Sequence, residues 1–395
     1  MSFLLFSYLA SEIMASFFAS LLILSSTLFL GKLAPLFDVI LEYGIGVADF
    51  VRLSAYFSAM ILLFCIPMAT MIGVNLAFTR LVHDREIMAF MSSGVGLSRL
   101  LFPVIVIALV ASAACAFFST YLVPKSHSAT KKIFFHLAKE RIEQGLDAKS
   151  FSRDIREVVI YVDHFDKDTK RLSGVFIVDN REKDNPMTVV AQQGELMTSL
   201  SEMRLTLTLK YGSLHRASNK TAQTIRFELY SLILPLEVPG YVAGVGTVQA
   251  GRKDMMINDL LTEIKKVGAE TPAGAGLLVE FHKRLVFPVG CLILGLLGIP
   301  LAFQTGFASR ALGTIIGLLL FILYYFFTAT AKMLGENGMA PVTLVMWTPN
   351  LIFTILTIIL LFRSARIGAL SVSDSSVVVL AWIRSLLFTW RKKTD

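Results

Sequence analysis

Apolar residues along this chain gather into six long runs, each about as long as a helix that crosses a membrane. A helix rises about 1.5 Å per residue, so roughly 20 apolar residues cross the hydrocarbon layer. The runs are Ile13–Ala34, Ser54–Phe78, Leu100–Leu122, Leu285–Ala302, Ala308–Ala331 and Val342–Phe362. Residues 1–12 are apolar with a polar edge, and they predict either a short interfacial helix or an extension of the first run. We expect the first run to be retained, because it is too long for the core of a cleavable signal peptide.

The stretch between the third and fourth runs has a different pattern. Four segments are rich in β-branched residues or alternate apolar with polar residues, namely Ile155–Val162, Gly174–Asp179, Met203–Leu209 and Thr224–Tyr230. A period of two predicts half-buried strands, and the turn-forming residues between them predict an antiparallel sandwich or jelly roll. Residues 256–267 predict a polar helix, and Val377–Trp390 predicts an amphipathic segment on the membrane surface.

These patterns predict an α-helical membrane protein with six transmembrane helices and an inserted all-β, jelly-roll-like domain. We expect four parts, listed in chain order: residues 1–123 with three transmembrane helices and a short helix at about 80–93, residues 124–276 with the β domain and its connectors, residues 277–362 with three more transmembrane helices, and residues 363–395 as a basic tail.

Basic residues near the ends of the spans predict the orientation. Six spans put both termini on one side, where the residues near the span ends are Arg80, Arg85, Arg99, Arg310, Arg363 and Arg366. The short loops on the other side carry Lys32, Arg52 and Lys332. Cytoplasmic loops carry the excess of Lys and Arg, so we expect cytoplasmic termini and a β domain outside the inner membrane, in the periplasm. Membrane orientation therefore explains the net charge of +8 without a nucleic-acid partner.

The composition and the motifs argue against metal sites, nucleotide-binding loops and ion relays in this chain. The chain is 55% hydrophobic and 17% charged, and its three cysteines, Cys65, Cys115 and Cys291, lie inside apolar runs. The histidines form no metal-binding pair, and the Gly31–Lys32 pair does not belong to a nucleotide-binding loop. We therefore expect no metal site, no cofactor and no catalytic residues. The middle of the spans holds amides and hydroxyls but almost no ionisable residue, so the energy for any uphill transport would have to come from a partner.

The loop after the second run could receive that energy. In TRLVHDREIMAFMSSGVG the apolar residues are spaced to form one face of a helix: Leu81, Val82, Ile87, Met88, Phe90 and Met91. Such a helix can dock into a groove of another protein or lie on the lipid surface, and periodicity leaves both alternatives open.

At this loop the sequence resembles the lipopolysaccharide export permease family LptF/LptG. The stretch RLVHDREIMAFMSSGVGLSRLLFPV resembles the family signature, with Glu86 at its acidic position and Ser93–Gly94 at its turn. Further resemblances follow in the family's order, at AQQGEL (191–196), LTLKYGSLHR (207–216), FELYSLILPL (227–236), HKRLVFPV (282–289), GIPLAF (298–303) and MWTPNLIF (346–353). The last of these is more similar to the LptF branch than to LptG.

The resemblance implies a transport subunit that is not itself an enzyme. It implies a complex with a sister permease, LptG, and a dimer of the cytoplasmic ATPase LptB, which would hydrolyse ATP. Lipopolysaccharide would enter from the outer leaflet of the inner membrane and pass through the β domains to LptC and LptA.

The resemblance also implies roles for particular residues. Glu86 would couple the permease to the ATPase, assisted by Arg85 and Asp84. Four cations near the outer ends of the spans would contact lipopolysaccharide: Lys32, Arg52, Lys283 and Arg284. Gly313 and Gly317 form a GxxxG pattern that predicts close helix packing, and the family implies a permease–permease interface there.

Three other functions fit parts of the pattern. An ATP-driven permease for another lipid or lipoprotein would share the coupling helix. A transmembrane signalling scaffold would need no ATPase. A membrane-embedded enzyme would require polar residues such as Glu280 and His282 to converge on one site.

Overall fold

The computed structural model describes most of the chain. The described residues are 3–43, 46–147, 152–155, 158–166, 169–180, 187–199, 204–218, 221–235, 250–305 and 310–367. The amphipathic segment predicted at Val377–Trp390 and the Gly-rich connector before residue 250 lie outside them.

The six predicted spans are confirmed as long apolar helices. They are α1 (Phe3–Tyr43), α2 (Val47–His83), α4 (Leu97–Phe117), α8 (Pro272–Thr305), α9 (Arg310–Glu336) and α10 (Val342–Ile367). Residues 3–12 continue the first span, so the alternative of a separate interfacial helix is wrong. Proline within the helices is tolerated because neighbouring helices and side chains satisfy the freed backbone groups.

Three of the helical elements are much longer than a bilayer requires. The helix α1 has 41 residues and α2 has 37, which correspond to roughly 61 Å and 55 Å of rise. The third span continues through a π-helical turn, η1 (Phe118–Leu122), directly into α5 (Val123–Asp147). The hydrocarbon layer is only about 30 Å thick, so these helices extend well beyond it.

The chain divides into two compact units. One contains residues 1–31, 57–126 and 251–395, and the other contains residues 32–56 and 127–250. The second unit therefore includes the hairpin between α1 and α2 in addition to the inserted β domain, which the sequence had not indicated.

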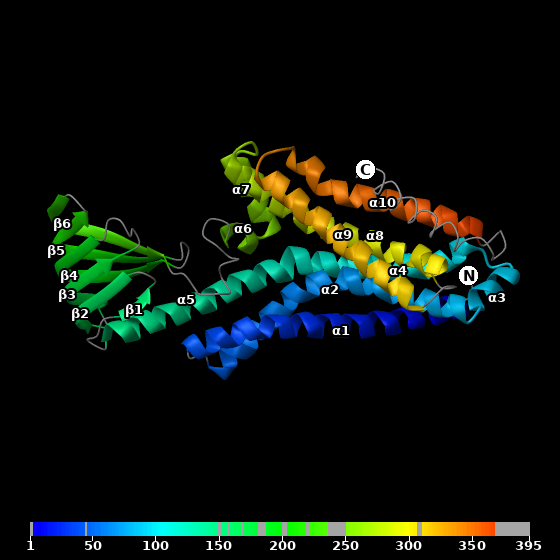
Figure 1. The fold of residues 1–395 in the computed structure, drawn as a ribbon, viewed down its shortest axis with the longest axis horizontal. Coiled ribbons are helices and arrows are strands. Elements are labelled where there is room, and N and C mark those ends of the chain that lie inside the picture. Colours follow the sequence, from blue (N-terminus) through cyan, green and yellow to red (C-terminus); the bar gives the residue numbers. More distant parts are fainter. Residues whose placement is uncertain are drawn as a thin grey trace, which may run out of the picture. The chain divides into compact units, whose positions relative to one another are not determined.

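Within the first unit, α8 packs against α4, α7 (Ile257–Val267), α9 and α10 (Figure 1). Glycines allow close approach: a Cβ added at Gly298 would lie 2.7 Å from the carbonyl oxygen of Met71 on α2. A Cβ added at Gly290 would overlap the hydroxyl of Tyr324 on α9. Small residues at such contacts let the backbones of two helices approach closely. In lipid, this close packing stabilises the helix pair through dispersion forces.

The β domain contains one antiparallel sheet with its six strands in chain order (Figure 1). The strands are β1 (Ser152–Ile155), β2 (Val158–Asp166), β3 (Arg171–Asp179), β4 (Met187–Ser199), β5 (Arg204–Ser218) and β6 (Thr221–Pro235). The predicted antiparallel β insert is thus confirmed, although β4, β5 and β6 are long, with 13, 15 and 15 residues, and in the described residues consecutive strands are neighbours throughout.

A crease crosses five strands of this sheet at one level. Regular pairing is interrupted at the same row in the four ladders from β2 to β6, and this row runs through Asp163, Gly174, Gln192, Tyr211 and Glu228. Two row residues have left-handed backbone conformations, with φ of 63° at Gly174 and 56° at Tyr211.

The alternation of buried and exposed positions along each strand shifts by one residue at this crease. In β2 the buried positions are Val158, Ile160 and Val162 on one side and Phe165 on the other, so two consecutive residues point outward between them. The same shift separates Leu172 from Val175 in β3. We call the two halves of the sheet, on either side of the crease, its limbs. The phase shift keeps the apolar side chains of both limbs on the concave side, although the strands bend.

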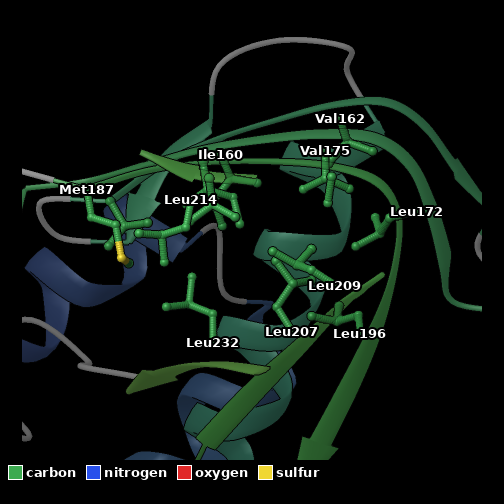
Figure 2. Close-up of a cluster of buried hydrophobic side chains, with 14 of the residues drawn as sticks. Ile160, Val162, Leu172, Val175, Met187, Leu196, Leu207, Leu209, Leu214 and Leu232 are labelled. Atoms are coloured by element: carbon green, nitrogen blue, oxygen red, sulfur yellow. The ribbon is translucent and has the colours of Figure 1, made fainter. Parts of the chain in front are cut away.

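The concave side encloses the core of the β domain. Figure 2 shows side chains from both limbs pointing toward one another, among them Val162, Val175 and Leu209. Ile177, Val189 and Leu209 are fully buried there. The crease therefore allows a single sheet to bury an apolar cluster that a flat sheet would leave open on one face.

We predict that Gly174→Ala will destabilise the β domain by at least about 1–2 kcal/mol, because a Cβ is unfavourable at φ 63° and would overlap the carboxylate of Asp163. Hydrogen exchange of β3 in the full-length protein in detergent measures this change. Tyr211→Gly is the matched control, since it relieves the left-handed conformation of an exposed residue, and its effect should stay within about 1 kcal/mol. Unchanged exchange in the Gly174 variant would contradict the crease as described.

Candidate functional site

The region predicted as a single helix at about 80–93 is divided between the end of α2 and one short helix. The helix α2 continues through His83, and α3 (Glu86–Ser92) begins after a turn. Arg85 stands at the start of α3 with a left-handed backbone, φ 60° and ψ 13°. This tight turn redirects the chain, so Glu86 lies in the first turn of a new helix.

The apolar face predicted for this loop is mostly used inside the chain. Leu81, Val82 and Ile87 are buried in a cluster with residues of α1 and α4, and Phe90 packs against the same cluster. Met88 is 41% exposed. A partner or a lipid surface would therefore meet mainly the polar side of α3 and Met88.

Two side-chain contacts connect the polar side of this region to α1, and a third joins the end of α2 to the turn after it. The hydroxyl of Tyr8 donates a hydrogen bond of 2.7 Å to Oε2 of Glu86. Arg80 donates to Oε1 of Glu12 at 2.6 Å and lies 3.7 Å from the carboxylate of Asp84. Sequence analysis missed Tyr8 and Glu12, although their spacing of four residues puts them on one side of a helix.

The four predicted outer cations fall into the two separate units. Lys32, on α1, and Arg52, on α2, belong to the second unit, where Arg52 pairs with Asp49 at 3.1 Å. Lys283 and Arg284 are consecutive residues of α8 in the first unit.

Arg284 is almost completely buried, with a side chain that is 2% exposed. Its guanidinium donates to the carbonyl oxygens of Met255, Arg252 and Lys253 at 2.7, 3.3 and 3.2 Å, and to Glu280 at 3.4 Å. The three carbonyls belong to the end of α6 (Ala250–Asp254) and the residue that follows it. A cation at the C-terminal end of a helix satisfies carbonyls that have no partner within the helix. These contacts support a structural role for Arg284, while lipid contact by this residue stays a prediction.

The beginning of α8 is shaped to receive α6 and α7, and residues 250–267, which contain these two helices, are called the connector below. Thr271 caps the helix by accepting a hydrogen bond of 3.0 Å from the backbone N–H of Gly274. A Cβ at Gly276 would overlap the guanidinium of Arg252, and a Cβ at Gly274 would overlap the carbonyl of Gly268. The small residues of the segment PAGAG therefore let α6 and the end of α7 lie directly on α8.

Lysines from three elements gather near this connector. Burial lowers the pKa of Lys253, and the positive charges of Lys283 and Lys332 lower it further. Glu280, at 3.4 Å from Lys283, and Glu336, at 3.9 Å from Lys332, act in the opposite direction. The ammonium groups are thus close enough to repel one another, an arrangement that an anion would stabilise.

Glu280 and His282 engage different partners. Glu280 pairs with Lys283 and Arg284, whereas both ring nitrogens of His282 contact α10. Trp347 donates to Nδ1 at 3.4 Å, and Nε2 lies 3.2 Å from the hydroxyl of Thr343. These contacts therefore do not bring Glu280 and His282 together, as a membrane-embedded enzyme would require. Among the residues described, no group of three His, Cys, Asp or Glu side chains could hold a metal ion.

Gly317 on α9 faces other helices of the same chain, and Gly313 is buried one turn before it. Both are buried, and a Cβ at Gly317 would lie 3.5 Å from Met71 and 3.9 Å from Leu301. The residues of α9 that are more than half exposed lie elsewhere around the helix: Ile315, Leu319, Ile322, Phe326 and Met333. The close helix packing predicted for the glycines is thus within this chain at Gly317, while a permease–permease interface at these glycines stays a prediction.

Two buried amides hold the spans together. Asn350 on α10 accepts from the hydroxyl of Tyr324 at 2.8 Å and donates to the carbonyl of Val286 at 3.1 Å. Asn75 on α2 donates to the carbonyl of Gly298 at 3.4 Å. Both amides therefore act between helices, so their observed contacts are structural.

Comparison with known proteins gives two matches. A family model described as "Lipopolysaccharide export system permease LptF/LptG" matches residues 7–363. An uncharacterized protein of Rickettsia prowazekii (strain Madrid E) is 29% identical over 166 residues, which is 42% of this chain. The match spans 44% of that relative, which is less than half of its length.

We predict that Arg284→Met will release α6 and α7 from α8. Removing one partner of a buried ion pair costs about 3–5 kcal/mol, and here it would also leave three carbonyls without their donor. Hydrogen exchange of residues 250–267 in the purified full-length protein should increase. Lys283→Met is the control, because this neighbouring side chain is 24% exposed and also pairs with Glu280, but it is not the donor to the three carbonyls, so protection of residues 250–267 should change less. Equal protection in the two variants would argue against Arg284 as the anchor.

Proposed function

Since the chain belongs to the lipopolysaccharide export permease family LptF/LptG, we propose that it is a permease subunit of an ATP-binding-cassette exporter that extracts lipopolysaccharide from the outer leaflet of the inner membrane. A sister permease would complete the membrane part, and an LptB dimer would hydrolyse ATP on the cytoplasmic side. The resemblance at residues 346–353 favours the LptF branch, with LptG as the sister subunit.

The distribution of buried polar groups carries this proposal. In the described part of the spans, the buried polar side chains are hydroxyls and amides together with Arg284, which the connector occupies. Ion-driven transporters place acidic or basic residues inside the membrane to carry protons or bind ions. In the described spans, Glu280 pairs with Arg284 in the first half of α8, and the remaining buried polar side chains are hydroxyls and amides, which supports an external source of energy.

The contact between the permease and the ATPase would be made by α3. Glu86 is held at the start of this helix with Oε2 bonded to Tyr8, and Asp84 and Arg85 form the turn before it. A carboxylate in this position can pair with a basic group of an ATPase. Since the apolar face of α3 is largely buried, the pairing would be mainly polar.

Lipopolysaccharide would be bound through two kinds of contact. Its phosphates would meet cations at the outer ends of the helices, with Lys32, Arg52 and Lys283 as candidates, and with Lys253 and Lys332 beside Lys283. Its acyl chains would follow the apolar concave side of the β domain, whose core is lined by both limbs of the sheet. The β domain would then deliver the lipid to LptC and LptA.

The orientation belongs to the same proposal. The excess of Lys and Arg near the span ends on the side of the termini supports a cytoplasmic α3 and a periplasmic β domain. Residues 1–123 and 277–362 would form the membrane part, residues 124–276 the periplasmic part, and residues 363–395 a cytoplasmic tail.

We predict that Glu86→Ala will reduce assembly with the ATPase or lipopolysaccharide-stimulated ATP hydrolysis at least tenfold, because a charge-assisted contact contributes about 1.5–3 kcal/mol. Copurification and ATP turnover of the complex in lipid nanodiscs measure the two effects. Glu263→Ala is a matched control, since it removes an exposed carboxylate on α7 that pairs with Lys266. Wild-type assembly and turnover in the Glu86 variant would reject this role.

We also predict that a photo-crosslinking residue at position 32 will capture lipopolysaccharide in cells. The same residue at Leu351, which is 62% exposed on α10, provides the control for general lipid contact. Mass spectrometry identifies the captured lipid. Capture of phospholipid alone at position 32 would contradict lipopolysaccharide binding there, and capture of a different lipid would identify another cargo.

A further inference from the structure

The contact between Tyr8 and Glu86 joins residues that lie 78 positions apart in the chain. Tyr8 is in the second turn of α1, and Glu86 is the first residue of α3. The hydroxyl of Tyr8 donates to only one carboxylate oxygen, Oε2. Glu86 is only partly buried, so its second oxygen can still be presented to a partner.

The backbones on both sides of this contact are fixed by packing. Leu9 and Ile13 of α1 are fully buried in the cluster that also contains Ile87 of α3. The helices α1 and α2 approach at backbone distance, because a Cβ at Gly73 would lie 2.7 Å from the Cα of Phe17. The distance between Tyr8 and Glu86 is therefore set by a close-packed core and does not depend on two flexible surface side chains alone.

The donor to Glu86 is a neutral hydroxyl. Tyr8 donates to Oε2 of Glu86 at 2.7 Å. The guanidinium of Arg80 contacts two other carboxylates, Glu12 on α1 and Asp84 in the turn. Glu86 is thus oriented by a contact that leaves one of its carboxylate oxygens for an incoming cation.

We propose that Tyr8 is a positioning residue, which holds the carboxylate of Glu86 ready for a basic side chain of the ATPase. This inference rests on the proposed coupling role of Glu86. A carboxylate that is already oriented loses less side-chain freedom on binding, so affinity increases without any new contact to the partner. The effect should appear in the affinity for the ATPase and leave the maximal turnover of the assembled complex unchanged.

The experiment compares Tyr8→Phe with the wild-type permease in the complete complex. We expect the dissociation constant for the LptB-type ATPase to rise roughly threefold to tenfold, as for one side chain that must be immobilised on binding. Maximal ATP turnover at saturating ATPase and the thermal midpoint of the permease should stay at their wild-type values. Ser11→Ala removes another hydroxyl of α1, which bonds only to the backbone carbonyl of Tyr8, and should have no effect.

A double-mutant cycle completes the test. In a Glu86→Ala background, Tyr8→Phe should cause no further loss of affinity. Wild-type affinity of Tyr8→Phe, together with weak binding of Glu86→Ala, would overturn the role of Tyr8 and leave the proposed function standing. An equal loss from Tyr8→Phe in both backgrounds would show that Tyr8 acts on the fold and not through Glu86. Unimpaired binding of Glu86→Ala would instead refute the proposed coupling itself.

Discussion

The cost of removing charge from water determines how this protein is organised. Hydrocarbon solvates neither ions nor free backbone groups, so the described spans keep ionised side chains near their ends and bury mostly hydroxyls and amides. Asn75 and Asn350 are used to join helices, and Arg284 is buried only because three carbonyls and a carboxylate surround it. The middle of such a membrane part offers few groups that could bind or release ions, so partners and substrates would act mainly on its two ends.

The two ends are connected to the spans by different physical means. At the end that carries α3, a ladder of side chains joins α1 and the last turn of α2 to the short helix. At the other end, a buried guanidinium and a platform of small residues hold the connector on α8. The first arrangement is partly exposed, so a partner can compete for its bonds. The second is desolvated, so it behaves as part of the core.

The sequence predicted the elements much better than the contacts between them. Hydropathy alone located all six spans, because runs of about 20 apolar residues are rare outside transmembrane helices. Alternation located strands, but it could not locate the crease, since two successive outward residues such as Gln192 and Gln193 resemble a simple loss of period. Position near a span end suggested a lipid contact for Arg284, whereas the fold surrounds it with the connector. The bond from Tyr8 to Glu86 gives no local signal, because its partners come from separate helices.

The crease restricts how the β domain can evolve. Each of five strands changes the phase of its inward residues at one common row, so the lengths of the strand segments on either side are coupled across the sheet. Deleting one residue on either side of that row would turn part of a strand inside out, exposing leucines and valines while burying polar neighbours. Insertions and deletions should therefore accumulate in the turns between strands, and relatives should keep the number of residues from each turn to the crease even where the side chains themselves have diverged.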